Sequence, residues 1–185
     1  MLEQEALQLR VFGLEAANLV LTHEANSNLN RLNPLNRPSI YEFAGGEQAF
    51  LALAAALTER CVEDPELNHA FSHGFSPNHN EHLAAYLAEV FGGPNTYSRN
   101  LGGHSGMLAI HAGQGAPDEW GDRFEACFIE AMDDAQLPRD ADLRKAMHDY
   151  IHWATREVNS YSPPSAIVDP DQPMPHWSWE GLVKT

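Results

Sequence analysis

The sequence is poor in basic residues and in long apolar runs, and each shortage excludes some kinds of binding partner or location for the protein. Only 11 lysines and arginines accompany 26 acidic residues, so the net charge is −15, and no basic cluster exceeds the pair Arg144-Lys145. We therefore expect no nucleic acid partner and no anionic membrane partner, because an acidic surface is repelled by both. No run approaches the roughly 18 apolar residues that a membrane-spanning helix needs.

Cysteine is almost absent, with Cys61 and Cys127 as the only two among 185 residues. Both lie among apolar neighbours within expected helices, which favours reduced core thiols over a disulfide. The N-terminal residues Met-Leu-Glu-Gln-Glu do not resemble a signal peptide. The sequence thus predicts a cytoplasmic protein.

No pattern typical of β-strands or of internal repeats is found, and helical periodicity predicts an all-α protein. We expect helices over residues 3–25, 47–63, 79–91, 105–111, 117–135 and 140–158. Side chains in helical phase are expected to face inward from the later helices: Phe50, Leu53, Ala54, Leu57, Cys61, Val62, Trp120, Phe124, Phe128, Met132, Leu143, Met147, Ile151, Ala154 and Val158.

Three segments follow from this pattern. Residues 1–38 comprise the first helix and a linker rich in Asn and Pro, and residues 39–160 form the helical body. Residues 161–185 form an extended arm, rich in proline, in which Trp177 and Trp179 are expected to pack on the body. We expect the first helix to dock as well, because its apolar stripe would otherwise remain in water.

Two histidines are the most informative residues of the body. His79 opens an apolar helical face that continues through positions 83, 86, 87 and 90, and this helix ends at Gly92-Gly93-Pro94. His111 is then expected on the inner face of a short helix, on the same side as Met107 and Leu108. Two facing histidines are compatible with a flat iron cofactor, but a hydrogen-bonded core histidine is an equally valid interpretation of His111.

Several motifs resemble those of the group II truncated haemoglobins across residues 39–160. They are Ser39-Ile-Tyr-Glu-Phe-Ala-Gly-Gly46, Asp64-Pro-Glu-Leu67, Phe91-Gly-Gly-Pro-Asn-Thr-Tyr-Ser98, Gly103-His104 and the run that ends at His111. The resemblance implies a two-over-two helical sandwich around haem b, with His111 as the proximal iron ligand. The N-terminal helix and the C-terminal arm would be additions to this fold.

On the distal side the sequence departs from the family pattern. The resemblance places His79 at the distal gate, Leu83 one turn later and Phe71 beside the haem face, where Tyr is common. Thr58 stands where the family usually has a Tyr, and Phe124 where it has a Trp. His79 and the Thr58 hydroxyl therefore remain as candidate groups that act on a bound ligand.

The residues expected near the haem edge are the second place where the sequence departs from the family pattern. Residues 107–110 contain none of the arginines that commonly lie near the haem propionates, so Tyr97, Arg99 and His104 are the available substitutes. Tyr86, on the apolar face that His79 opens, is a further candidate for haem contact.

The function that the resemblance implies is binding of oxygen or another small diatomic ligand at the haem iron. NO-dioxygenase or peroxidase-type activity would follow from that site, with a reductase as partner, and a homodimer is compatible with the sequence. Two alternatives stay open: a non-catalytic gas sensor or interaction protein, and a globin fold without haem.

The other histidines have simpler interpretations. His148 and His152 are spaced four residues apart, as in zinc sites, but no third ligand is evident and solvent-facing side chains are favoured. His69 and His73 are expected in loops or at the surface, and His82 either joins them or approaches the haem edge.

Overall fold

The structure is a computed structural model that describes residues 37–71 and 76–184, apart from the side chains of Ala70 and Phe71. One compact unit begins at Ser39 and includes the C-terminal arm. The helix expected over residues 3–25 and nearly all of the linker lie outside the described residues, so their docking stays a prediction.

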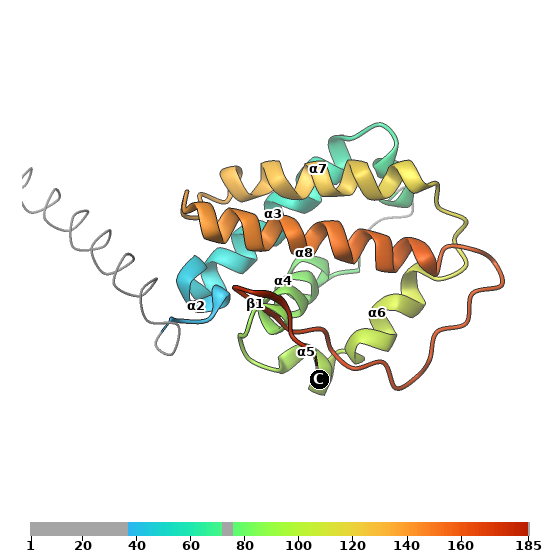
Figure 1. The fold of residues 1–185 in the computed structure, drawn as a ribbon. Helices are drawn as coiled ribbons and strands as arrows, with labels where there is room; N and C mark the ends of the chain where they lie inside the picture. The colour runs from blue at the N-terminus through green and yellow to red at the C-terminus, as the bar shows by residue number, and fades with distance from the viewer. Residues whose placement is uncertain (1–36, 72–75, 185) are drawn as a thin grey trace, which may run out of the picture. The chain divides into compact units, whose positions relative to one another are not determined.

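The body is helical, as expected, and its elements follow one another along the chain (Figure 1). The helices are α2 (Ile40–Ala44), α3 (Gly46–Glu63), the 3-10 helix η2 (Leu67–Phe71), α4 (His79–Val90), α5 (Thr96–Asn100), α6 (Gly103–His111), α7 (Asp118–Asp134) and α8 (Ala141–Ser160). The expectation of no strands was wrong at one place, where β1 (Trp177–Ser178) pairs antiparallel with β2 (Gly181–Leu182). Gly181 makes this hairpin by adopting a φ of 107°, which other residues rarely adopt.

Four long helices form the core of the fold. Helix α3 packs against both α4 and α7, and α7 runs antiparallel to α8 (Figure 1). The residues buried between them include Phe50 and Leu57 of α3, Phe128 of α7 and Tyr150 of α8. Val62 was expected in this core but is 41% exposed, because it lies off the stripe formed by Phe50, Leu57 and Cys61.

The two cysteines lie where α3 meets α7. Cys61 is buried, Cys127 is half-buried, and both are free thiols. Burial raises the pKa of each thiol, most strongly for Cys61, so both remain protonated at neutral pH.

The Gly92-Gly93 pair allows the start of the body to dock on the end of α4. The Tyr41 amide donates to the Phe91 carbonyl over 2.9 Å, and the Gly93 amide donates to the Ala88 carbonyl over 2.7 Å. A Cβ at Gly93 would lie 2.8 Å from the Ala88 oxygen and 2.9 Å from the Tyr41 ring. The motif is therefore a point of close approach between α2 and α4.

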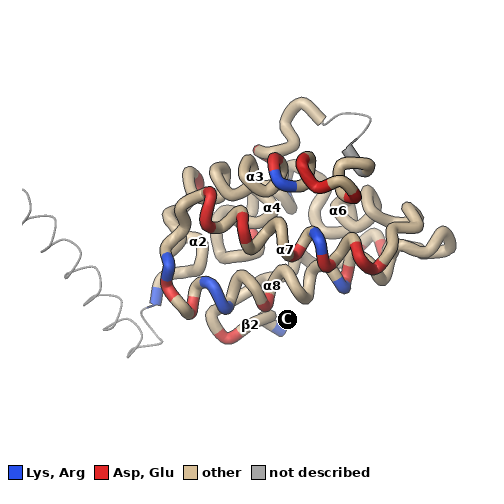
Figure 2. Tube along the Cα trace, turned by 90° about the horizontal axis from the view of Figure 1, so that it is seen from above, with Lys and Arg blue, Asp and Glu red and all other residues tan. Residues whose placement is uncertain are grey.

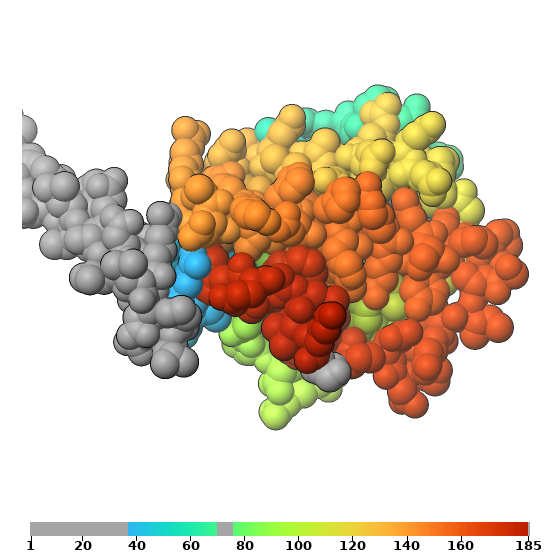
Figure 3. Space-filling model, viewed as in Figure 1, coloured from blue at the N-terminus to red at the C-terminus, as the bar shows by residue number. Residues whose placement is uncertain are grey.

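The C-terminal arm returns along the body and ends in the hairpin, which packs against α8 (Figures 1 and 3). Trp177 is only 8% exposed, and its ring lies 5.7 Å from both Tyr150 and Trp153. Upstream, the Ser105 hydroxyl donates to the Asp169 carbonyl over 2.8 Å and accepts from the Gln172 amide over 2.9 Å. The tryptophan packing expected from the sequence is thus present.

Acidic positions are spread along α3, α7 and α8, with basic positions beside several of them (Figure 2). Arg60 of α3, for example, pairs with Glu130 and Asp134 of α7. None of the helices formed by the described residues is long and apolar enough to cross a membrane.

Candidate functional site

The sequence places His111 on the inner face of its helix, but in the structure the side chain of this last residue of α6 is exposed, whereas Leu108 of the same helix is buried. His111 Nδ1 lies 2.9 Å from the Met107 carbonyl oxygen, one helical turn earlier. Because a carbonyl only accepts, Nδ1 must carry the proton of a neutral ring, and Nε2 keeps its lone pair. This hydrogen bond also orients the ring, as second-shell contacts do for metal-ligating histidines.

His79 begins α4 and is half-buried. Burial lowers its pKa, and the charges of His82 and His111 lower the pKa further. The influence of His111 means that α4 and α6 bring the two imidazoles near enough to repel each other when charged. His79 is therefore neutral at pH 7 and has both a ring N–H and a ring nitrogen lone pair.

The Thr58 hydroxyl, on α3, donates to the Asn80 side-chain oxygen over 2.8 Å. This hydrogen bond ties α3 to the first turn of α4, next to His79. Thr58 could donate to a ligand only if the bond to Asn80 broke.

The apolar candidates occupy three elements. Leu83 of α4 and Phe124 of α7 are half-buried and pack against the core. Phe71 ends η2, and its side chain lies outside the described part of the structure. Leu83 lies one turn after His79 on α4, and the half-buried Met107 lies one turn before His111 on α6, so each histidine has an apolar neighbour on its own helix.

No local sequence pattern predicts a contact between Tyr86 and His104, but the fold brings the two side chains together. The Tyr86 hydroxyl lies 2.9 Å from His104 Nδ1, and His104 Nε2 lies 3.2 Å from a Glu157 carboxylate oxygen on α8. Both ring nitrogens of His104 thus have protein partners, which argues against a contact with a haem propionate. Of the other two residues proposed for the haem edge, Tyr97 is buried and Arg99 is exposed.

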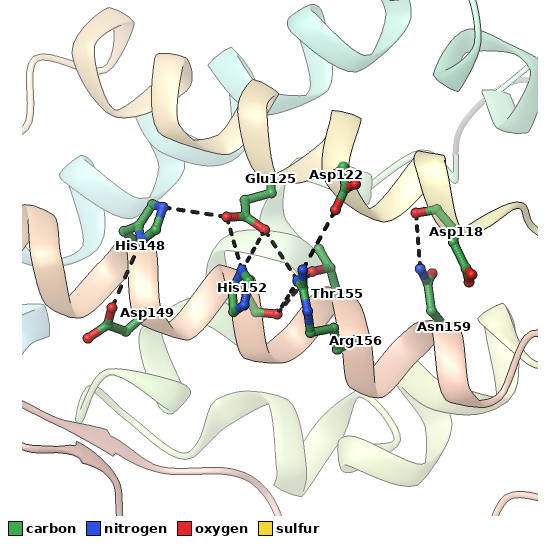
Figure 4. A network of polar contacts seen from close by, with 9 residues as sticks. All are labelled: Asp118, Asp122, Glu125, His148, Asp149, His152, Thr155, Arg156 and Asn159. Atoms are coloured by element: carbon green, nitrogen blue, oxygen red, sulfur yellow. Dashed lines mark hydrogen bonds and ion pairs between the residues drawn. The ribbon is translucent and has the colours of Figure 1, made fainter.

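His148 and His152 lie on the exposed side of α8, in agreement with their solvent-facing interpretation (Figure 4). The sequence did not reveal their partner, Glu125 of α7, whose carboxylate lies 3.4 Å from His148 Nε2 and 3.2 Å from His152 Nδ1. Arg156 Nη1 approaches the same carboxylate at 3.5 Å. Within the described ranges, no group of three or more His, Cys, Asp or Glu side chains is arranged to hold a metal ion.

The family model of the bacterial-like globins matches residues 39–157, which include α3, α4, α6, α7 and nearly all of α8. The chain belongs to the bacterial-like globin family. Its fold is that of the group II truncated haemoglobins.

Solved structures similar to this globin support the same assignment. The haemoglobin of Chloroflexus aurantiacus is 30% identical, with a TM-score of 0.57 over 65% of this chain and 97% of that one. The haemoglobin of Thermobifida fusca is 31% identical, with a TM-score of 0.55 over 65% of this chain and 96% of that one. The group II truncated haemoglobin of Bacillus anthracis, at 21% identity and a TM-score of 0.58 over 65% of this chain and 90% of that one, shares the fold. No curated protein matches the chain.

Membership of this family implies a haem cofactor. The sequence singles out His79 and His111 as candidates because each stands on a helix that its local pattern predicts, and their roles stay a prediction. It missed the contacts of His104, because Tyr86 and Glu157 are remote in sequence and no spacing signals their meeting.

Proposed function

We propose that this globin binds haem b with His111 as the axial iron ligand. The observation that supports this most is the hydrogen bond from His111 Nδ1 to the Met107 carbonyl, since it leaves Nε2 as a preoriented lone pair. The half-buried apolar side chains of Leu83, Met107 and Phe124 suit the faces of a porphyrin. When bound, the haem would supply an iron that binds small ligands and exchanges electrons.

The cofactor type follows from cysteine usage. Covalent attachment of a c-type haem requires a C-x-x-C-H motif, and neither Cys61 nor Cys127 lies in one. We therefore propose noncovalent haem b. Arg99 is then the cationic side chain available to a propionate, because it is exposed and lies between α4 and α6 in the chain.

His79 is the proposed distal residue. It is neutral because burial lowers its pKa, so it can donate an N–H to a bound ligand or offer its lone pair to the iron as a sixth ligand. Thr58 acts through Asn80, whose side chain it holds at the start of α4. Leu83 and Phe124 would exclude water from the same side.

The reaction that we propose is binding of oxygen or a similarly small ligand, with NO-dioxygenase or peroxidase-type turnover. A reductase would return the iron to the ferrous state, and the strongly acidic surface suits a partner with a basic docking face. The cytoplasm is the proposed compartment, and a homodimer is the oligomer to test. Gas sensing without turnover is the competing function.

Absorption spectra of the purified full chain test cofactor binding. We expect a Soret band in the ferric protein and its shift on reduction and on addition of carbon monoxide. A protein that stays colourless after reconstitution with haemin would be a globin fold without haem. Consumption of nitric oxide by the oxygenated protein, or of peroxide by the ferric protein, well above that of free haemin separates turnover from sensing.

A further inference from the structure

Three ionisable side chains form a chain in the interior of the globin. The hydroxyl of Tyr86 on α4 bonds Nδ1 of His104 on α6, and Nε2 of His104 faces Glu157 on α8. His104 is 3% exposed and Tyr86 is 6% exposed, and their rings stack at 22° with centroids 6.1 Å apart. Three helices thus bring these groups together at a place with little access to water.

The positions of the protons on these three side chains follow from Glu157, the acceptor nearest the surface. An ionised Glu157 can only accept, so a neutral His104 carries its proton on Nε2, and its Nδ1 accepts from the Tyr86 hydroxyl. The Tyr86 hydroxyl, the His104 imidazole and the Glu157 carboxylate are therefore linked one after another by these contacts. In such an arrangement the imidazole can take the hydroxyl proton while the carboxylate stabilises the imidazolium that forms.

We propose that Tyr86 is a redox-active tyrosine whose proton passes to His104 as Tyr86 gives up one electron. The inference rests on the proposed haem function, because the oxidant is a hydroperoxide acting on the bound haem. The hydroperoxide takes two electrons by way of the haem and two protons from solvent, its O–O bond breaks, and it becomes an alcohol and water, or two waters; Tyr86 supplies one of the two electrons and the proposed reductase supplies the other. Tyr86 returns one electron to the haem; its O–H bond breaks, an Nδ1–H bond forms on His104, and a neutral tyrosyl radical remains.

Burial explains why this tyrosine needs a dedicated proton acceptor. Burial raises the pKa of Tyr86 well above its ordinary value, so the phenol keeps its proton at neutral pH. Loss of an electron alone would leave a positive charge in a site that disfavours charge. His104 removes that charge from the phenol, and Glu157, with a partly exposed carboxylate, balances it near the surface.

Further aromatic side chains continue from Tyr86 toward the surface. Tyr150 of α8 adds to the effect of burial in raising the pKa of Tyr86, and the Tyr150 ring lies 5.7 Å from Trp177 and 6.3 Å from Trp153. Trp153 is half-buried and therefore reaches solvent. Oxidisable rings at this spacing give the oxidising equivalent a route away from the haem.

The test compares radical formation in four haem-loaded proteins mixed with hydrogen peroxide and freeze-quenched for electron paramagnetic resonance. Wild type should show a tyrosyl radical that Tyr86→Phe lacks. Tyr161→Phe is the matched control and should keep the radical, because the Tyr161 hydroxyl accepts from the side-chain amide of Gln172 at 3.2 Å and has no histidine partner among the described residues.

Glu157→Gln separates the redox role from a purely structural one. The amide oxygen can still accept from His104 Nε2, so the packing survives, but the charge that stabilises the imidazolium is gone. Radical formation should slow by about 100-fold, because His104 stays as the proton acceptor but its imidazolium has lost the carboxylate that stabilises it. This variant also stays informative if Tyr86→Phe does not fold.

An unchanged radical yield in Tyr86→Phe, or an unchanged rate in Glu157→Gln, would overturn the proposal. If wild type binds no haem, the proposed function fails instead. The same four proteins are then oxidised by a flash-generated ruthenium(III) complex, which needs no haem. The Tyr86-dependent radical is expected there too, and its absence would overturn the proposal by itself.

Discussion

At the residue scale, the first turn of α4 determines which group a ligand meets on the proposed distal side. His79→Leu removes an N–H donor whose hydrogen bond to a ligand contributes roughly 1 kcal/mol, so oxygen should dissociate about fivefold faster. His148→Leu, on the exposed side of α8, is the matched control and should leave the rate unchanged. If His79 is instead a sixth ligand, the variant loses a low-spin spectrum and binds ligands faster. If the spectrum and both rates stay the same, His79 lies outside the site.

Gly93 lies where the surrounding atoms leave no room for a side chain. A Cβ there would meet the Ala88 carbonyl oxygen at 2.8 Å and the Tyr41 ring at 2.9 Å. We expect Gly93→Ala to lower the free energy of unfolding by about 1–3 kcal/mol, as overpacking does in other cores. Urea titration measures it, with Gly106→Ala as the control because the nearest heavy atom there is 4.0 Å away. Equal stability of Gly93→Ala and wild type would contradict the close approach.

Local patterns predict the helices on which His79 and His111 stand, and so make these two residues candidates, but the side chain of His111 is exposed where the pattern predicts an inner face. They could not predict the partners of His104, which the sequence analysis placed near a propionate. The engagement of the Thr58 hydroxyl by Asn80 was equally hidden, since the two residues lie on different helices. Long-range polar contacts leave no periodic trace in a sequence.

At the element scale, Asp64 terminates α3 and organises η2. Its carboxylate accepts from the Glu66 and Leu67 amides, each over 2.9 Å, and pairs with Arg123 of α7 at 2.9 Å. The bond to Leu67 is the largest cause of a lowered Asp64 pKa, followed by the bond to Glu66 and the pairing with Arg123.

A lowered folded-state pKa means that Asp64 stabilises the fold above its unfolded pKa of about 3.9, and that this stability is lost as pH falls through the folded value. Asp64→Asn should therefore lower the melting temperature at pH 7 and lose less stability than wild type on acidification. Melting curves from neutral pH to pH about 3 test it, with Asp171→Asn as the exposed control. Parallel pH profiles for Asp64→Asn and wild type would show that the carboxylate does not act in this way.

The hairpin of the arm tests whether β1 and β2 are part of the folded body. Trp177 packs on Tyr150 and Trp153, and truncation of a buried tryptophan costs about 3–5 kcal/mol. Trp177→Ala should therefore lower the melting temperature clearly. Ile167→Ala, at a position 88% exposed in the same arm, should change stability by less than about 0.5 kcal/mol. Similar melting temperatures for both variants would mean that the hairpin does not stabilise the core.

Long elements were predictable and short ones were not. The expected helices at 47–63, 117–135 and 140–158 match α3, α7 and α8 within two residues at each end, because an apolar stripe and end signals define each one. Helices α2, η2 and α5 and the hairpin have five residues or fewer per element. Such short elements depend on tertiary contacts, such as the Ser98 amide of α5 that donates to the buried Glu89 carboxylate at 2.9 Å.

At the scale of the whole molecule, the fold brings together side chains that the sequence holds apart. Helices α4 and α6 carry His79 and His111; α4 packs against α3, and α6 packs against α5 and is tied to α8 by the pairing of His104 with Glu157. The bacterial-like globin family accounts for residues 39–157, and the arm adds a hairpin that closes on α8. The account therefore depends on one claim, that this body exists to hold haem on His111.

Haem retention in His111→Ala tests that claim most directly. The measurement is the ratio of Soret to protein absorbance after gel filtration of wild type and variant, both reconstituted with haemin. His111→Ala should lose the haem on the column or keep it only when free imidazole replaces the missing ligand, whereas His82→Ala should keep it. A His111→Ala protein with the haem content and spectrum of wild type would contradict the account.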